Sequence, residues 1–208
     1  MNSFIHGVRL SVAGVILLNI LGCGTSQPSH FYLLRAISPT SSSDLSEVKP
    51  SNLSVGLGPV TLPKYLDRPQ IVTQSGTHEV ELADFHKWAE PLSDNVSHVL
   101  TENLSALLST DRILQYPWSS SIPVDYQIVV DVSQFDGTMG GEAVLVARWS
   151  LWGNAEKELF MQKTSRFSEV LRSGEYEELV ETMSRMLASL SGEIADAIKA
   201  RIPGSSLK

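Results

Sequence analysis

Three consecutive segments decide the fold of this 208-residue chain: VDYQIVVDVSQF (residues 124–135), EAVLVARWSLW (142–152) and KELFMQKTSRFS (157–168). In the first two, apolar side chains alternate with mostly polar ones, which is the two-residue period of a strand with one buried face. Glycine-rich turns at residues 137–141 and 153–154 separate the segments. The pattern predicts a three-stranded antiparallel meander.

Two amphipathic segments flank this meander. Residues 91–109 start with a proline and repeat leucine and valine at helical spacing, and residues 175–201 carry a second apolar stripe before Pro203-Gly204. Shorter strands are predicted at residues 31–34, 53–60, 70–73, 79–82 and 112–116. The order of elements predicts one α+β domain, in which an antiparallel sheet carries both helices on one face.

Composition and charge exclude several classes of protein. The chain is 42% hydrophobic and 19% charged, as in an ordinary globular domain, and its formal net charge is −7. Phosphate backbones and anionic membrane surfaces repel an acidic chain. We therefore expect neither a nucleic-acid partner nor polybasic docking on a membrane.

The N-terminus has the pattern of an export signal. Arg9 precedes a largely apolar run over Leu10 to Leu21, which is shorter than the roughly 20 residues that span a bilayer. The run ends in Ile20-Leu21-Gly22-Cys23, the aliphatic, variable, small, Cys order of a lipoprotein processing site. The small residue suits the peptidase, and the thiol can form a diacylglyceryl thioether. We predict a signal peptide over residues 1–22 and lipidation of Cys23.

Cys23 is the only cysteine in the chain. The alternative, a buried structural cysteine beside a membrane anchor, leaves a free thiol that no internal disulfide can take up, so lipidation is the better interpretation. Residues 23–29 then form a tether that spans roughly 25 Å at most when extended. The folded domain is expected over residues 30–204.

No motif for catalysis or cofactor binding is present in the sequence. A nucleophile elbow, a P-loop and a zinc-binding helix are all missing. The histidines beyond the signal peptide show no paired ligand spacing; they are His30, His78, His86 and His98. Asp84, Glu90 and Asp94 are better explained as a solvated face than as an acid–base pair. We expect no catalytic residue, no cofactor and no metal.

The stretch over residues 58–72, GPVTLPKYLDRPQIV, is different in kind. Prolines restrict the backbone on both sides of Tyr65, Leu66 and Arg68. One interpretation is a rigid loop that contacts a partner together with Trp88. The other is a structural turn whose tyrosine and leucine cover the edge of the sheet, and composition alone slightly favours it.

Four features together resemble the ABC-type transport auxiliary lipoproteins. They are the processing site at Cys23, Phe31-Tyr32-Leu33-Leu34, the 58–72 stretch, and Lys-Trp-Ala-Glu-Pro-Leu over residues 87–92. The resemblance implies a non-enzymatic accessory subunit anchored to the outer membrane on its periplasmic face. Gly24, rather than aspartate, follows Cys23, which fits outer-membrane sorting in bacteria that use that rule.

The resemblance also implies partners. These are a periplasmic protein with MCE domains and an inner-membrane transport component, in a system that moves lipids between membranes and maintains envelope integrity. Ring-like self-assembly is implied as well. Our leading hypothesis is a binding subunit that contacts its partner through Tyr65, Leu66, Arg68 and Trp88. The alternative is a lipid carrier with an apolar cavity on the order of 300–1,000 Å³ for an acyl chain.

Overall fold

The computed structural model describes residues 27–36, 52–119, 121–153 and 158–202. The predicted signal peptide and Cys23 lie outside the described residues. The described helices do not combine the length and the apolar character that a membrane span requires.

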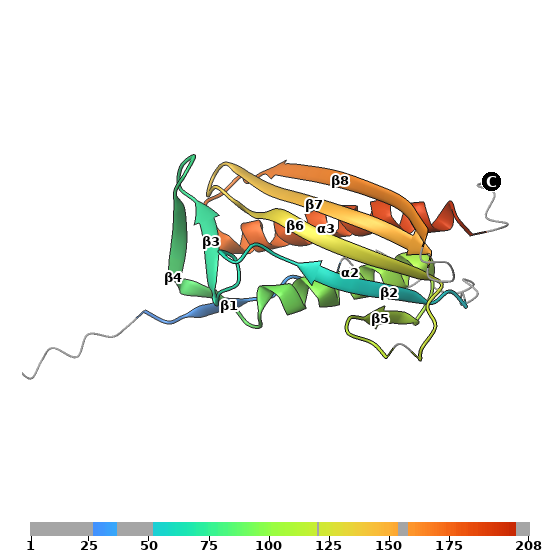
Figure 1. Ribbon diagram of the computed structural model, residues 1–208. Helices are drawn as coiled ribbons and strands as arrows, with labels where there is room; N and C mark the ends of the chain where they lie inside the picture. The colour runs from blue at the N-terminus through green and yellow to red at the C-terminus, as the bar shows by residue number, and fades with distance from the viewer. Residues whose placement is uncertain (1–26, 37–51, 120, 154–157, 203–208) are drawn as a thin grey trace, which may run out of the picture.

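The main sheet has five strands in the order β5-β2-β6-β7-β8 (Figure 1). These are β2 (Val55–Thr61), β5 (Ile113–Gln115), β6 (Tyr126–Gly137), β7 (Glu142–Gly153) and β8 (Glu158–Val170). The meander of β6, β7 and β8 is antiparallel, as predicted. However, β2 runs parallel to both β5 and β6, so the sheet is mixed and the expectation of a purely antiparallel sheet is wrong. The chain returns between β2 and β6 through other elements, and such a crossover permits parallel pairing.

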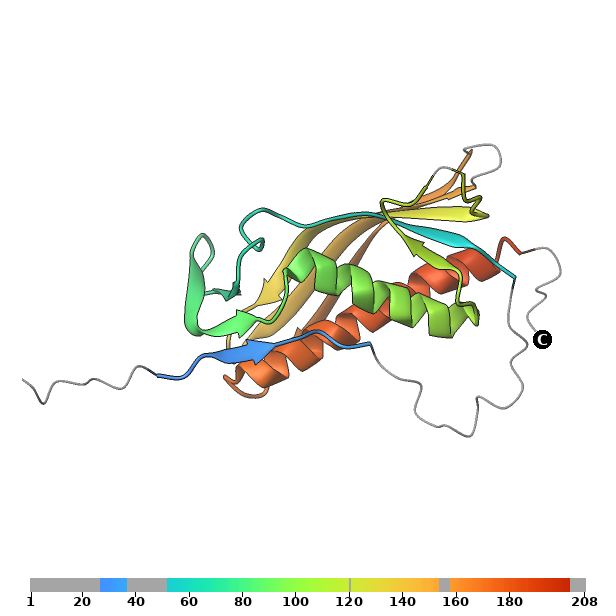
Figure 2. The ribbon, with the colours of Figure 1, turned by 90° about the horizontal axis from the view of Figure 1, so that it is seen from below.

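A smaller sheet, of order β1-β4-β3, stands at one end of the main sheet (Figures 1 and 2). Its strands are β1 (His30–Tyr32), β3 (Gln70–Gln74) and β4 (Val80–Trp88). β1 pairs parallel with β4, and β3 pairs antiparallel with it. β4 extends six residues beyond the strand predicted at residues 79–82, and a bulge interrupts its pairing with β3.

Both helices, α2 (Leu92–Leu108) and α3 (Tyr176–Lys199), cover the same face of the main sheet, as predicted (Figure 2). The core between them is continuous. Phe135 and Trp149 from the sheet, Leu100 from α2 and Met186 from α3 are each at most 1% exposed. Complete burial of such a side chain contributes about 1.5–3 kcal/mol to the stability of the fold. Burial of these side chains therefore holds the sheet and the helices together.

The glycines of β2 allow close approach by aromatic side chains. A Cβ atom on Gly56 would stand 2.5 Å from the ring of Trp118. Gly58 has a φ of +125°, and a Cβ there would stand 2.5 Å from Cβ of Tyr116. The segment after β5 therefore packs directly on the backbone of β2.

Candidate functional site

The loop over residues 62–69 joins β2 to β3, and Tyr65 fastens it to the main sheet. The Tyr65 hydroxyl donates a 2.7 Å hydrogen bond to Oδ2 of Asp136, a residue near the end of β6 that is 1% exposed. Nε2 of Gln74 donates to the same oxygen at 2.9 Å, and Nε2 of Gln134 donates to Oδ1 at 3.0 Å. The buried carboxylate thus ties the loop, β3 and β6 together. Burial, and then the bond to Asp136, raise the pKa of Tyr65 above its ordinary value.

Leu66 lies inside the domain. Its side chain is 2% exposed and belongs to the hydrophobic core. The backbone turns tightly around it: the Leu66 N–H donates to the Pro63 carbonyl at 3.0 Å, and the Asp67 N–H donates to the Lys64 carbonyl at 3.2 Å. Leu66 therefore anchors the turn by burying its side chain.

Trp88 lies beside the loop, but its ring is buried. Its backbone N–H donates to the Pro69 carbonyl at 2.7 Å, while the residue is only 5% exposed. The prediction that Leu66 and Trp88 contact a partner directly is therefore corrected: their side chains are covered by the core, where removal from water stabilises them. For these two residues and Tyr65, the interpretation as a structural turn agrees with the geometry.

Arg68 differs from the other three residues. It is only partly buried, and its Nε atom, although buried, has no hydrogen-bond partner within the described part of the chain. Lys64 and Asp67 beside it are exposed. We call Lys64, Asp67 and Arg68 the loop surface. A hollow of about 280 Å³ lies between this loop and Ser93 at the start of α2, and Lys64 and Asp67 of the loop surface border it.

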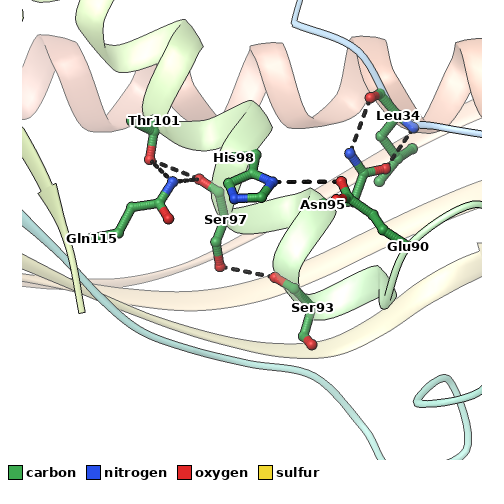
Figure 3. A network of polar contacts seen from close by, with 8 residues as sticks. All are labelled: Leu34, Glu90, Ser93, Asn95, Ser97, His98, Thr101 and Gln115. Carbon is green, nitrogen blue, oxygen red and sulfur yellow. Dashed lines mark hydrogen bonds and ion pairs between the residues drawn. The ribbon is translucent and has the colours of Figure 1, made fainter. Parts of the chain in front are cut away.

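A polar network at the start of α2 fixes the N-terminal segment (Figure 3). Asn95 is 5% exposed; its Oδ1 accepts a 2.7 Å bond from the Leu34 N–H, and its Nδ2 donates to the Leu34 carbonyl at 3.2 Å. The Asn95 side chain thus makes the two hydrogen bonds with the Leu34 backbone that a neighbouring strand would otherwise make. Sequence reasoning missed this residue, although a polar amide on the apolar stripe of a helix was a signal.

Other polar groups of this network also link structural elements. Nε2 of Gln115, on β5, donates to Oγ1 of Thr101 on α2 at 2.8 Å (Figure 3). Nδ1 of His98 lies 3.5 Å from a carboxylate oxygen of Glu90, one of the three acidic residues considered for acid–base chemistry. Asp84, another of the three, is exposed on β4.

The pairing of β1 with β4 assembles an aromatic cluster that sequence spacing could not reveal. The rings of His30 and His86 stack with centroids 5.2 Å apart, and His86 stacks on Tyr176 of α3 at 4.1 Å. Oη of Tyr32 lies 2.7 Å from Nδ1 of His86. Burial, and then the neighbouring His30, lower the pKa of His86. The described residues contain no group of three or more side chains suited to holding a metal ion.

Two solved structures have folds similar to that of this chain. The crystal structure of an uncharacterized protein superposes with a TM-score of 0.67 and 22% identity, covering 83% of this chain and 99% of that one. Protein XCC0632 from Xanthomonas campestris gives a TM-score of 0.63 and 14% identity, covering 80% and 93%. These likenesses show a shared fold.

Sequence comparison adds the family. The intermembrane transport lipoprotein PqiC of Escherichia coli (strain K12) is 25% identical over 190 residues, which are 91% of this chain and 96% of the relative. PqiC of Shigella flexneri matches equally well. Residues 32–195 match the model of the ABC-type transport auxiliary lipoprotein component. The resemblance inferred from the sequence is thus confirmed, and the chain belongs to the ABC-type transport auxiliary lipoprotein family.

Proposed function

We propose that this transport auxiliary lipoprotein is anchored through Cys23 to the outer membrane, on its periplasmic face. There it acts as a non-enzymatic accessory subunit of an intermembrane lipid transport system. Its partners are an MCE-domain protein of the periplasm and an inner-membrane transport component. The observation that carries the proposal is the family match over residues 32–195, together with a relative named as an intermembrane transport lipoprotein.

The N-terminal sequence supports the anchor. The processing site ends at Cys23, the only cysteine, and Gly24 follows it. Acyl chains add about 0.8 kcal/mol per buried CH₂ group, so an N-terminus with several chains stays on its membrane. Replacement of Cys23 by Ser should abolish incorporation of radiolabelled palmitate and release the chain from the outer-membrane fraction. A Cys23→Ser chain that still takes up palmitate would contradict the proposed anchor.

The alternative function, a carrier with an acyl-chain pocket, has less support. A groove of about 730 Å³ runs between β1 and α3, which is large enough for a ligand. However, it is open, and its lining includes Arg35, Glu177, Glu181 and Arg185. Desolvating these charges would oppose the entry of a hydrocarbon chain. The accessory role is therefore the function we propose.

The loop surface is the proposed partner contact. Arginine is one of the residues that dominate interfaces, and the buried Nε of Arg68 retains a donor for which the described residues offer no acceptor. Three other contacts hold the loop rigid: the Tyr65–Asp136 bond, the buried Leu66 and the Trp88–Pro69 bond. Little conformational entropy would then be lost on docking.

The test is binding of the full chain to the MCE-domain protein of the same bacterium. We expect Lys64→Glu and Arg68→Glu to weaken binding at least about tenfold, or about 1.4 kcal/mol. The matched control is Arg166→Glu, which makes the same charge change at an exposed position on β8. Equal affinities for all three variants would exclude the loop surface as the contact, and absence of binding by the unmodified chain would contradict the accessory role.

A further inference from the structure

One face of the small sheet carries exposed apolar side chains. The register is set by four pairs: Phe31 with Lys87, Gln70 with Lys87, Val72 with Leu82, and Gln74 with Val80. Paired residues point to the same face, and every second residue along a strand does so too. Phe31, Val80 and Leu82 therefore share one face, and they are 65%, 43% and 39% exposed. Leu33, which directly follows β1, is 38% exposed. We call these four residues the apolar face.

At β3 this face packs on the domain, since Val72 is 4% exposed and Gln74 donates to the buried Asp136. The opposite face of the small sheet packs on the domain as well. Tyr32 and His86 contact Tyr176 of α3, and Trp88 joins the core. Because strand residues alternate between faces, Glu81 lies on this opposite side from Val80 and Leu82. The charge of Glu81, after the larger effect of burial, raises the pKa of Tyr176, which agrees with a position on the α3 side. Val80 and Leu82 thus lie on the other side of β4 from Glu81, while Phe31 and Leu33 border the groove between β1 and α3.

The apolar face also lies where the chain enters the domain. Phe31 is eight residues after Cys23, so an extended chain places it no farther than roughly 29 Å from the proposed lipid anchor. β6 has 12 residues and ends at the small sheet (Figures 1 and 2), and a strand of that length covers roughly 40 Å. The reach of the tether is therefore shorter than the main sheet is long. Whatever the orientation of the domain, the end that carries the small sheet stays within this reach of the membrane.

We propose that the apolar face rests on the lipid bilayer that holds the acylated Cys23; this inference depends on the anchor proposed above. Because the tether already holds the domain at the membrane, the apolar face meets the bilayer at a high effective concentration. Even a small apolar contact can then form. Because the chain has a net charge of −7, attraction to anionic lipids cannot hold it there. Burial of apolar side chains in the interface of a zwitterionic bilayer can hold the domain there instead.

Lys87 fits this arrangement. It is partly buried and shares the apolar face by its pairing with Phe31. A lysine stem can lie along apolar surface while its ammonium group reaches a lipid phosphate. Docking of this face would direct the segment around Trp118, at the other end of the main sheet, away from the membrane.

A fluorescent probe at single added cysteines tests the proposal. The full lipidated chain is prepared as Phe31→Cys and Leu82→Cys, with Ile122→Cys as the control; Ile122 is 41% exposed and precedes β6 at the far end. Each is labelled with an NBD maleimide and reconstituted into phosphatidylethanolamine–phosphatidylcholine vesicles with or without nitroxide-labelled lipid. The unsubstituted chain should take no label, because the proposed thioether consumes its only thiol.

We expect the probes at positions 31 and 82 to emit at shorter wavelength and to be quenched by nitroxide lipid, while the probe at 122 is not. If all three remain unquenched although the protein floats with the vesicles, the inference is overturned and the anchor stands. A blue shift at 31 and 82 without quenching also overturns it, because a protein surface then covers the apolar face. A chain that does not float overturns the anchor, and the inference with it.

Discussion

The hydroxyl of Tyr65 and Oδ2 of Asp136 lie 2.7 Å apart, and this contact joins the proline-bounded loop to the buried end of β6. The tyrosine comes from the stretch that carries the family resemblance, while the aspartate comes from the meander that forms the sheet. The contact therefore couples the position of the loop surface to the main sheet.

Removing this hydroxyl should destabilise the domain. We expect Tyr65→Phe to lower the free energy of unfolding by about 1–3 kcal/mol, because the buried Asp136 carboxylate loses one of its donors. Urea denaturation measures the effect. The control is Tyr116→Phe, since Tyr116 is 59% exposed, and we expect a change within about 0.5 kcal/mol. Equal effects of the two substitutions would contradict a structural role for the bond.

The same contact makes stability depend on alkaline pH. The pKa of Tyr65 is raised in the folded state, so its contribution is complete below about pH 10, where a free tyrosine ionises, and is lost as the pH rises toward the folded pKa. The free energy of unfolding should fall above about pH 10, and less steeply for Tyr65→Phe. The pKa values of Tyr32, Tyr126 and Tyr176 are also raised, so these residues contribute to the slope that remains in Tyr65→Phe. Parallel curves for the two proteins would disprove this contribution.

The meander and both helices could be predicted from the sequence because each has its own local period. Their ends agree with the structure to within about two residues. The parallel pairings could not be predicted in this way. His30 lies beside His86, and Val55 beside both Ile113 and Tyr126, and no local pattern in one strand specifies such a distant partner.

The candidate site was predictable in position but not in exposure. Trp88 does meet the loop, through the Pro69 carbonyl. That Leu66 and Trp88 are buried depends on how the small sheet folds against the main one, and the periodicity of a short, proline-bounded stretch carries no information on that. Asn95 was missed because a helical stripe was read for its apolar members alone.

Asn95 should contribute more to the free energy of unfolding than an average helix residue. We expect Asn95→Ala to lower the free energy of unfolding by about 1–3 kcal/mol, because both backbone groups of Leu34 lose their buried partner. Hydrogen exchange of the Leu34 amide should also accelerate. The control is Glu102→Ala on the exposed side of the same helix, which should leave that amide protected. Unchanged exchange in Asn95→Ala would show that other contacts hold the segment.

The last prediction concerns Gly56, whose missing side chain makes room for Trp118. We expect Gly56→Ala to destabilise the domain by about 1–3 kcal/mol, since its Cβ would stand 2.5 Å from the indole ring. Trp118→Ala removes the obstacle, so adding Gly56→Ala to that variant should cost less, and a double-mutant cycle measures the coupling. Gly192→Ala is the control: it lies within α3 with nothing within 4 Å, and should stabilise the helix by about 0.5–1 kcal/mol. Additive effects of the Gly56 and Trp118 substitutions would mean that the aromatic ring is not what requires glycine at this position.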